Sequence, residues 1–186
     1  MRKIFPVLLV LIGLGFLVGG SYTVVRGIDA RSAVRAELAR QDITTTPDAR
    51  IPNVKVTDAN TAQVMADVIQ KHVDEITGGR SYAELGRYLT ADGKGDTSDE
   101  NLAMKDKDGN PVNNPVRDLA LTADTLRTGL YTSIMALNMA DLVIGLGVAI
   151  VVIGLVFGGL GVRFGALPSS ALARTLAVQP ATAIHG

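Results

Sequence analysis

Two long runs without charge constrain the fold of this 186-residue chain more than any other feature. Residues 4–25 form a run of 22 and residues 142–162 a run of 21, and neither contains Asp, Glu, Lys, Arg or His. At about 1.5 Å per residue, either run as a helix crosses the roughly 30 Å hydrocarbon core of a bilayer. The charged middle of the chain could not bury two such helices on all sides. The runs therefore predict two transmembrane helices.

The first run also has features of a cleaved secretory signal. Arg2 and Lys3 precede it, and residues 18–20 (VGG) resemble a small-residue cleavage site. The apolar run continues beyond that point to Val25, which favours a retained span. Cleavage is the alternative.

Charge is distributed unevenly along the chain, although the net charge is zero. All 18 acidic residues lie between Asp29 and Asp141. The ends beyond the two runs carry only basic residues, and Lys and Arg close to a span are retained in the cytoplasm. Both termini are therefore expected in the cytoplasm of a multi-pass protein of the cell membrane. The predicted segments are 1–25 (short N-terminus and first transmembrane helix), 26–141 (extracytoplasmic domain), 142–162 (second transmembrane helix) and 163–186 (cytoplasmic tail).

The segment outside the membrane is predicted to be helical, which gives an all-α membrane protein with a small helical extracytoplasmic domain. The first transmembrane helix is expected to continue to about Gln41, and the last helix to run without a break from about Arg117 through the second span. Between them, Thr57 or Asp58 caps a helix that residues 78–79 (GG) end.

Two further elements are expected after this helix. A capping box of Ser81 and Glu84 predicts a short helix over residues 82–89. Residues 91–116 are rich in Gly, Asp, Asn and Pro and predict an acidic loop. The apolar spacing indicates no internal repeat and no heptad array, and the two helix extensions are expected to form a stalk.

Few residues suggest chemistry. The chain has no cysteine and two histidines, His72 and His185, which the predicted topology places on opposite sides of the membrane. His72 lies on an apolar helix stripe, where a packed or partner-facing side chain is favoured over a metal ligand. The sequence predicts no metal site and no cofactor.

The acidic loop and the edge of the second span each leave an alternative open. Residues 106–110 (DKDGN) resemble part of a calcium loop, but an EF-hand in that register would begin at Met104 and end at Pro115, so a turn is favoured. Asp141 adjoins the apolar run, and we expect it at the membrane interface; a proton relay or a polar contact between helices is the alternative.

Pairs of glycines four residues apart predict close helix packing. Small residues at this spacing lie on one helix face and let backbones approach, which favours association where lipid is as apolar as leucine. The predicted packing or partner interface consists of Gly15, Gly19, Gly154, Gly158, Gly161 and Gly165, with Asp141 and His72 as polar contacts.

Three segments resemble a family of small actinobacterial membrane proteins that have an N-terminal span, an outer helical segment and a C-terminal span. They are ITTTPDARIP (residues 43–52), TGGRSYAELGRYL (77–89) and LRTGLYTSIMALNMADLVIGLGVAIVVIGL (126–155). Members are often labelled as a subunit of an aromatic ring-opening dioxygenase. Such iron chemistry typically relies on two histidines and a carboxylate, which this chain does not supply on one side of the membrane.

The sequence thus favours a noncatalytic structural or assembly accessory subunit with integral membrane protein partners. It shows no nucleotide-binding or nucleophile motif and no basic outer surface for nucleic acid, and we infer no small-molecule substrate. By analogy with the resembled family, the respiratory cytochrome reductase–oxidase supercomplex is the expected host, with a role alongside electron transport. A membrane-anchored sensor or binding protein is the alternative, and an enzyme or proton-conducting subunit that uses Asp141 ranks below it.

Overall fold

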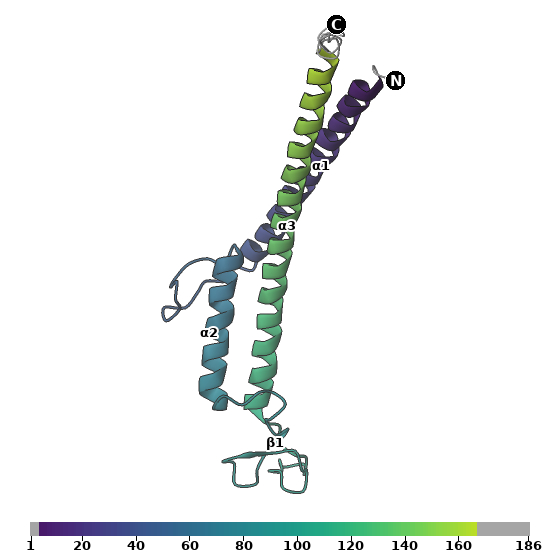
Figure 1. Ribbon diagram of the computed structural model, residues 1–186. Helices are drawn as coiled ribbons and strands as arrows, with labels where there is room; N and C mark the ends of the chain where they lie inside the picture. The colour runs from purple at the N-terminus through teal and green to yellow at the C-terminus, as the bar shows by residue number, and fades with distance from the viewer. Residues whose placement is uncertain (1–3, 167–186) are drawn as a thin grey trace, which may run out of the picture. The chain divides into compact units, whose positions relative to one another are not determined.

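The computed structural model describes residues 4–166, which form three helices and two short strands (Figure 1). In chain order they are α1 (Ile4–Arg40), α2 (Ala59–Thr77), β1 (Tyr88–Leu89), β2 (Asp96–Thr97) and α3 (Pro115–Ala166). The described chain divides into two compact units, of which residues 4–28 and 141–166 are one and residues 29–140 the other. We call the first the helix pair and the second the outer unit. Both long helices were predicted, and the break between the units falls close to the predicted ends of the spans.

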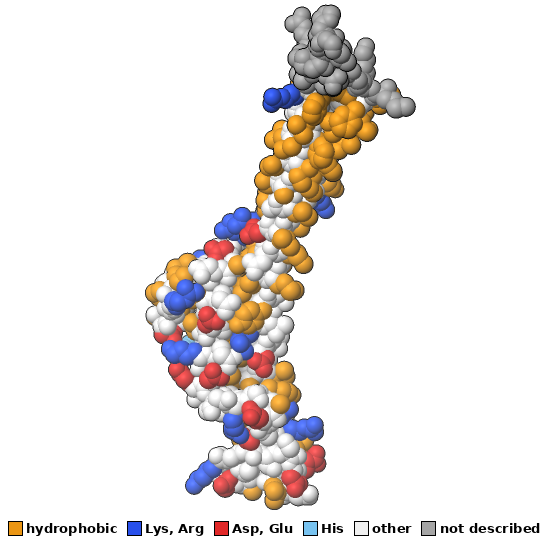
Figure 2. Space-filling view, viewed as in Figure 1, with side chains coloured by type: hydrophobic (Ala, Val, Ile, Leu, Met, Phe, Trp, Pro, Cys, Tyr) orange, Lys and Arg blue, Asp and Glu red, His pale blue; other side chains and the backbone are white. Residues whose placement is uncertain are grey.

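The helix pair consists of the apolar parts of α1 and α3. By length and composition both helices are able to cross a membrane, and only 11% of the most apolar window of each is buried within the protein. Side chains such as Ile4, Val18 and Leu142 are 66–70% exposed. Figure 2 shows hydrophobic side chains along the helix pair, whereas most acidic and basic side chains lie on the outer unit. The apolar side chains of a core helix in a soluble protein are mostly buried, whereas these are exposed. Their exposure is consistent with a lipid environment.

The outer unit is organised around α2. The Asp58 carboxylate accepts from the Thr61 backbone N–H at 2.9 Å, and Thr61 closes the capping box. At the other end Gly78 has φ of +67°, the left-handed conformation that commonly ends a helix. The predicted start and end of this helix are therefore confirmed.

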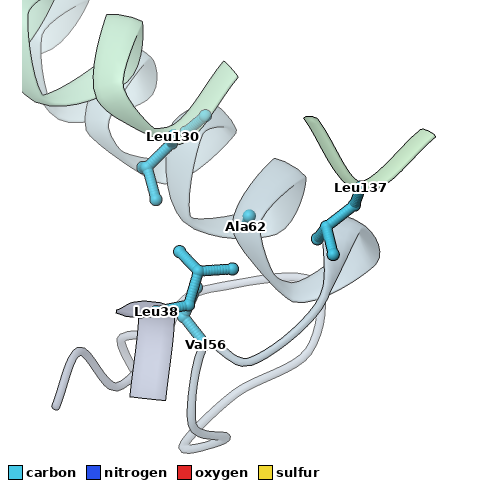
Figure 3. Close-up of a cluster of buried hydrophobic side chains, with 6 residues drawn as sticks. Leu38, Val56, Ala62, Leu130 and Leu137 are labelled. Atoms are coloured by element: carbon cyan, nitrogen blue, oxygen red, sulfur yellow. The ribbon is translucent and has the colours of Figure 1, made fainter. Parts of the chain in front are cut away.

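One face of α2 buries an apolar cluster with the end of α1 and the outer part of α3 (Figure 3). Its buried members are Leu38, Val56, Ala62, Ala66, Leu130 and Leu137. Leu38 is 2% exposed and Val56 1%, so the cluster excludes water. This core belongs entirely to the outer unit. Burial of its apolar side chains away from water stabilises the parts of α1 and α3 that continue into this unit.

The predicted helix over residues 82–89 is wrong. Glu84 does accept from the Ser81 backbone N–H at 2.8 Å, as in a capping box, but only one turn forms before β1 begins. Gly86 explains the change, because a Cβ there would lie 2.4 Å from the Thr97 backbone nitrogen. The chain approaches β2 too closely at this point for a helix to continue.

The acidic loop is also more structured than predicted. β1 and β2 pair antiparallel, with Tyr88 opposite Thr97, and isolated bridges join Thr90 to Ala103 and Lys105 to Pro111. Buried Asn114 connects this lobe to α3: its side-chain N–H donates to the Gly86 carbonyl and its side-chain oxygen accepts from the Val116 backbone N–H, both at 3.0 Å. The outer unit is therefore helical with a small β lobe.

Candidate membrane-helix interface

Within the helix pair, α1 and α3 meet along a seam of glycines. A Cβ on Gly13 would lie 2.6 Å from the Gly158 nitrogen, and one on Gly154 would lie 2.8 Å from the Gly13 carbonyl oxygen. Farther along, Cβ atoms on Gly20 and Gly147 would each come within 2.8 Å of the opposite helix. The backbones are thus in direct contact, which only glycine permits.

The buried glycines recur every seven residues in both helices. They are Gly13, Gly20 and Gly27 in α1 and Gly147, Gly154 and Gly161 in α3. This spacing corrects the expectation that the chain has no heptad array, and it is the period that keeps one face of each helix toward its partner in a left-handed pair. The signal was present in the sequence as small residues rather than as leucines.

The six predicted interface glycines divide between two faces. Gly154 and Gly161 lie in the seam, and Gly158 is contacted there through its backbone. A Cβ on Gly165 would lie at ordinary contact distance, 3.7 Å, from Pro6. Gly15 and Gly19 are exposed and have open space at the Cβ position. Since two residues correspond to about 200° around an α-helix, Gly15 lies nearly opposite Gly13.

Two aromatic contacts between α1 and α3 accompany the seam. The rings of Phe16 and Phe157 have centroids 6.0 Å apart and are tilted by 49°, and those of Phe5 and Phe164 are 6.5 Å apart. These tilted geometries are favourable for aromatic pairs. They show that large side chains of the two helices also pack against each other beside the glycines.

The predicted polar contacts are not among the residues that a Cβ on a seam glycine would meet. Asp141 is exposed, and it is the residue at which α3 enters the helix pair along the chain. In the outer unit, the His72 ring nitrogen lies 3.0 Å from the Asp48 carboxylate, which Lys71 also contacts at 2.8 Å. Hydrogen bonds from Lys71, Thr46 and His72 hold the pKa of Asp48 well below its usual range. The geometry is that of an exposed ion pair; His185 lies outside the described residues.

Carboxylates of the β lobe are used in local structure. The Arg80 guanidinium beside Asp96 lowers the pKa of that carboxyl, and the two side chains approach to 2.7 Å. Asp106 accepts from the backbone N–H groups of Asn110 at 2.8 Å and Asp108 at 2.9 Å, which lowers its pKa. These bonds match the favoured turn at this position. Among the described residues, no group of three or more His, Cys, Asp or Glu side chains has an arrangement able to hold a metal ion.

An apolar groove of about 300 Å³ opens on the outer unit. It is lined by residues from α1, α2, α3 and the segment after α1: Leu38, Gln41, Ile43, Met65, Ile69, Thr125, Leu126, Gly129, Leu130 and Ser133. None of these is ionisable, and the hydroxyls of Thr125 and Ser133 donate to carbonyls of their own helix. The groove fits apolar groups and offers no acid, base or nucleophile.

No family model, curated protein or solved structure matches this chain. The arrangement itself defines a class only broadly: a mostly helical protein with two apolar helices long enough to span a membrane and a second unit built on their continuations.

Proposed function

We propose that this protein is a noncatalytic structural or assembly subunit that binds another integral membrane protein through α1. One observation carries the proposal. One set of glycines packs α1 against α3. A second pair, Gly15 and Gly19, lies exposed on the other side of α1.

The free energy of helix association in a bilayer supports a partner interface on this face of α1. In a bilayer a helix gains little by hiding leucine, and association depends on close packing. A face that presents Gly15 and Gly19 between exposed apolar side chains such as Leu8, Leu11 and Tyr22 allows a partner helix to approach closely. The outer unit adds the apolar groove as a second contact for uncharged groups.

The proposal includes a topology and a host. Both termini lie in the cytoplasm and the outer unit is extracytoplasmic, on the asymmetry of charge. The resemblance to small actinobacterial membrane proteins suggests an assembly such as the respiratory reductase–oxidase supercomplex.

Affinity isolation from native membranes tests the proposal. The protein with a C-terminal tag is extracted in mild detergent, and its companions are identified and quantified for the wild type and for Gly15→Leu/Gly19→Leu. Ser21→Leu is the matched control, because it also places leucine on an exposed small position of α1, on a different face. We expect a stoichiometric set of membrane subunits that the double variant loses and the control keeps. Unchanged recovery with the double variant would contradict the proposal.

A further inference from the structure

In the outer unit, α3 has a second line of side chains that the rest of the described chain leaves exposed. We call it the outer seam; its members follow alternating spacings of four and three residues and are Leu121, Thr125, Thr128, Thr132, Met135 and Met139. Leu121 is 48% exposed, Met135 64% and Met139 59%. This spacing is the one by which a helix meets another helix in a coiled coil. The opposite side of α3 carries Leu130 and Leu137, which the core already buries.

The polar members of the outer seam are prepared for burial. The hydroxyls of Thr125, Thr128 and Thr132 each donate, at 2.8 Å, to the backbone carbonyl four residues earlier. A partner that covers them therefore leaves no hydroxyl donor unsatisfied, which removes the main cost of burying such groups. Together with the leucine and the two methionines, they form a surface that gains from leaving water.

The outer seam is also free of charge. None of its six members is ionisable, and small residues flank it on one side at seven-residue spacing: Thr122, Gly129 and Ala136. On the other side Asp124 and Tyr131 lie directly beside the outer seam, and Arg127 contacts Asp124 at 3.5 Å. Exposed Asp118 continues the same line of positions toward the start of α3, so the charge-free surface begins at Leu121. The small flanks leave room for a second helix to approach closely.

From these features we infer that the outer seam pairs with the outer seam of a second copy of this chain, helix parallel to helix. Two copies anchored in one membrane have the same orientation, so a twofold axis along the membrane normal places each residue opposite its own counterpart. Every charge in such an interface would meet a like charge, which is destabilising. The six positions of the outer seam carry no charge, so pairing between two copies brings no like charges together. A different partner could carry the opposite charge and would not require a charge-free surface. The inference rests on membrane anchoring and does not require the accessory role, although Thr125 and Gly129 also line the groove.

Cysteine crosslinking in native membranes tests the pairing, since the chain has no cysteine of its own. Full-length Thr128→Cys and Met135→Cys are oxidised in membranes, with Ile76→Cys, a 54% exposed position on α2, as the control. We expect a disulfide-linked species of twice the chain mass for the first two and a monomer for the control. A link only to a different protein would overturn the inference, as would no link at thiols that still react with maleimide.

A charge exchange at Thr132 makes the test specific for symmetry. In the Met135→Cys background, Thr132→Glu alone and Thr132→Lys alone should each lower the yield of linked dimer by about tenfold, which corresponds to roughly 1.4 kcal/mol. Co-expressed Glu and Lys copies with different tags should restore a mixed dimer, because opposite charges then meet. If both variants fold with the wild-type thermal midpoint and the mixed dimer does not form, the inference is wrong.

Discussion

The helix pair and the outer unit solve the problem of packing helices in different ways. In the helix pair the glycines bring backbones together and large apolar side chains such as Leu142 remain exposed. In the outer unit the same two helices bury large side chains, with Leu38 2% exposed and Leu130 5% exposed. Water drives apolar groups together, whereas lipid does not, so close contact replaces burial as the source of stability. The two units should therefore respond oppositely to changes in side-chain size.

The largest effect is expected from enlarging a seam glycine. In Gly154→Leu the new Cβ would lie 2.8 Å from the Gly13 carbonyl oxygen and 2.9 Å from the Leu17 nitrogen, so the helices must separate. An engineered cysteine pair at Phe16 and Phe157, whose rings are 6.0 Å apart, measures this separation. Crosslinking should fall at least about tenfold.

Gly159→Leu is the matched control for this seam variant, because it places the same side chain on α3 where a Cβ meets nothing within 4 Å. Equal crosslinking in Gly154→Leu and Gly159→Leu would contradict a backbone-to-backbone seam.

A cavity in the outer core comes next in size. Leu38→Ala removes a side chain from the centre of the cluster and should lower the free energy of unfolding by about 2–5 kcal/mol. Leu102→Ala, at a 60% exposed position, should change it by no more than about 0.5 kcal/mol. The measurement is a denaturant titration of the full chain in detergent, with hydrogen exchange in α2 as the local readout of unfolding. A loss of protection confined to the helix pair would be inconsistent with this core.

The sequence predicted the long elements well because their signals are strong. Two charge-free runs, the Asp58 cap and Gly78 are local features, and the structure has α1, α2 and α3 where they indicate. The helix over residues 82–89 was wrong because Gly86 packs against β2, a contact that only the folded chain reveals. The interface glycines were partly predicted: a four-residue spacing found Gly154 and Gly161 but not the seven-residue repeat through Gly13, Gly20 and Gly147.

The β lobe is joined to α3 by polar side chains, which have no counterpart in the glycine seam: Asn114 is one, and the Arg117 guanidinium, which donates to the Leu85 carbonyl, is another. Asn114 is 2% exposed and joins Gly86 to Val116. Asn114→Ala leaves buried backbone groups without partners and should cost about 1–3 kcal/mol. Exposed Asn113→Ala is the neighbouring control. Faster hydrogen exchange at Leu89, whose N–H donates to Val112, would report the loosened lobe, and unchanged exchange would show that the lobe is held by other contacts.

Glycine itself has a different role in each unit, and a pair of substitutions separates the roles. The backbone at position 78 has φ of +67°, a conformation that glycine adopts without strain. Gly78→Ala should therefore destabilise α2 by about 1–2 kcal/mol, and Gly78→Asn by less, since Asn tolerates this conformation. At Gly154 the order should reverse, because only size matters there and Ala is the smaller residue. Thermal midpoints of the four variants test the prediction; the same ranking at both sites would contradict the distinction.

The smallest effect expected is a difference in response to acid. Hydrogen bonds, the strongest of them from Lys71, hold the pKa of Asp48 well below its usual range, and the pKa values of Asp58, Asp96 and Asp106 are also lowered. A carboxyl with a lowered pKa in the folded state adds stability above its unfolded pKa, and this contribution is lost as the pH falls through the folded value. The outer unit should therefore weaken progressively below about pH 4.

This acid response should be absent from the glycine seam, whose packing residues carry no ionisable side chain. Unfolding midpoints of the outer unit between pH 7 and pH 3, recorded beside the Phe16–Phe157 crosslink, compare the two units directly. Asp48→Asn should flatten the acid response only slightly, because the side chain is exposed and acts as one of several. A parallel loss of the crosslink would mean that the helix pair derives its stability from the outer unit and not from its own glycines.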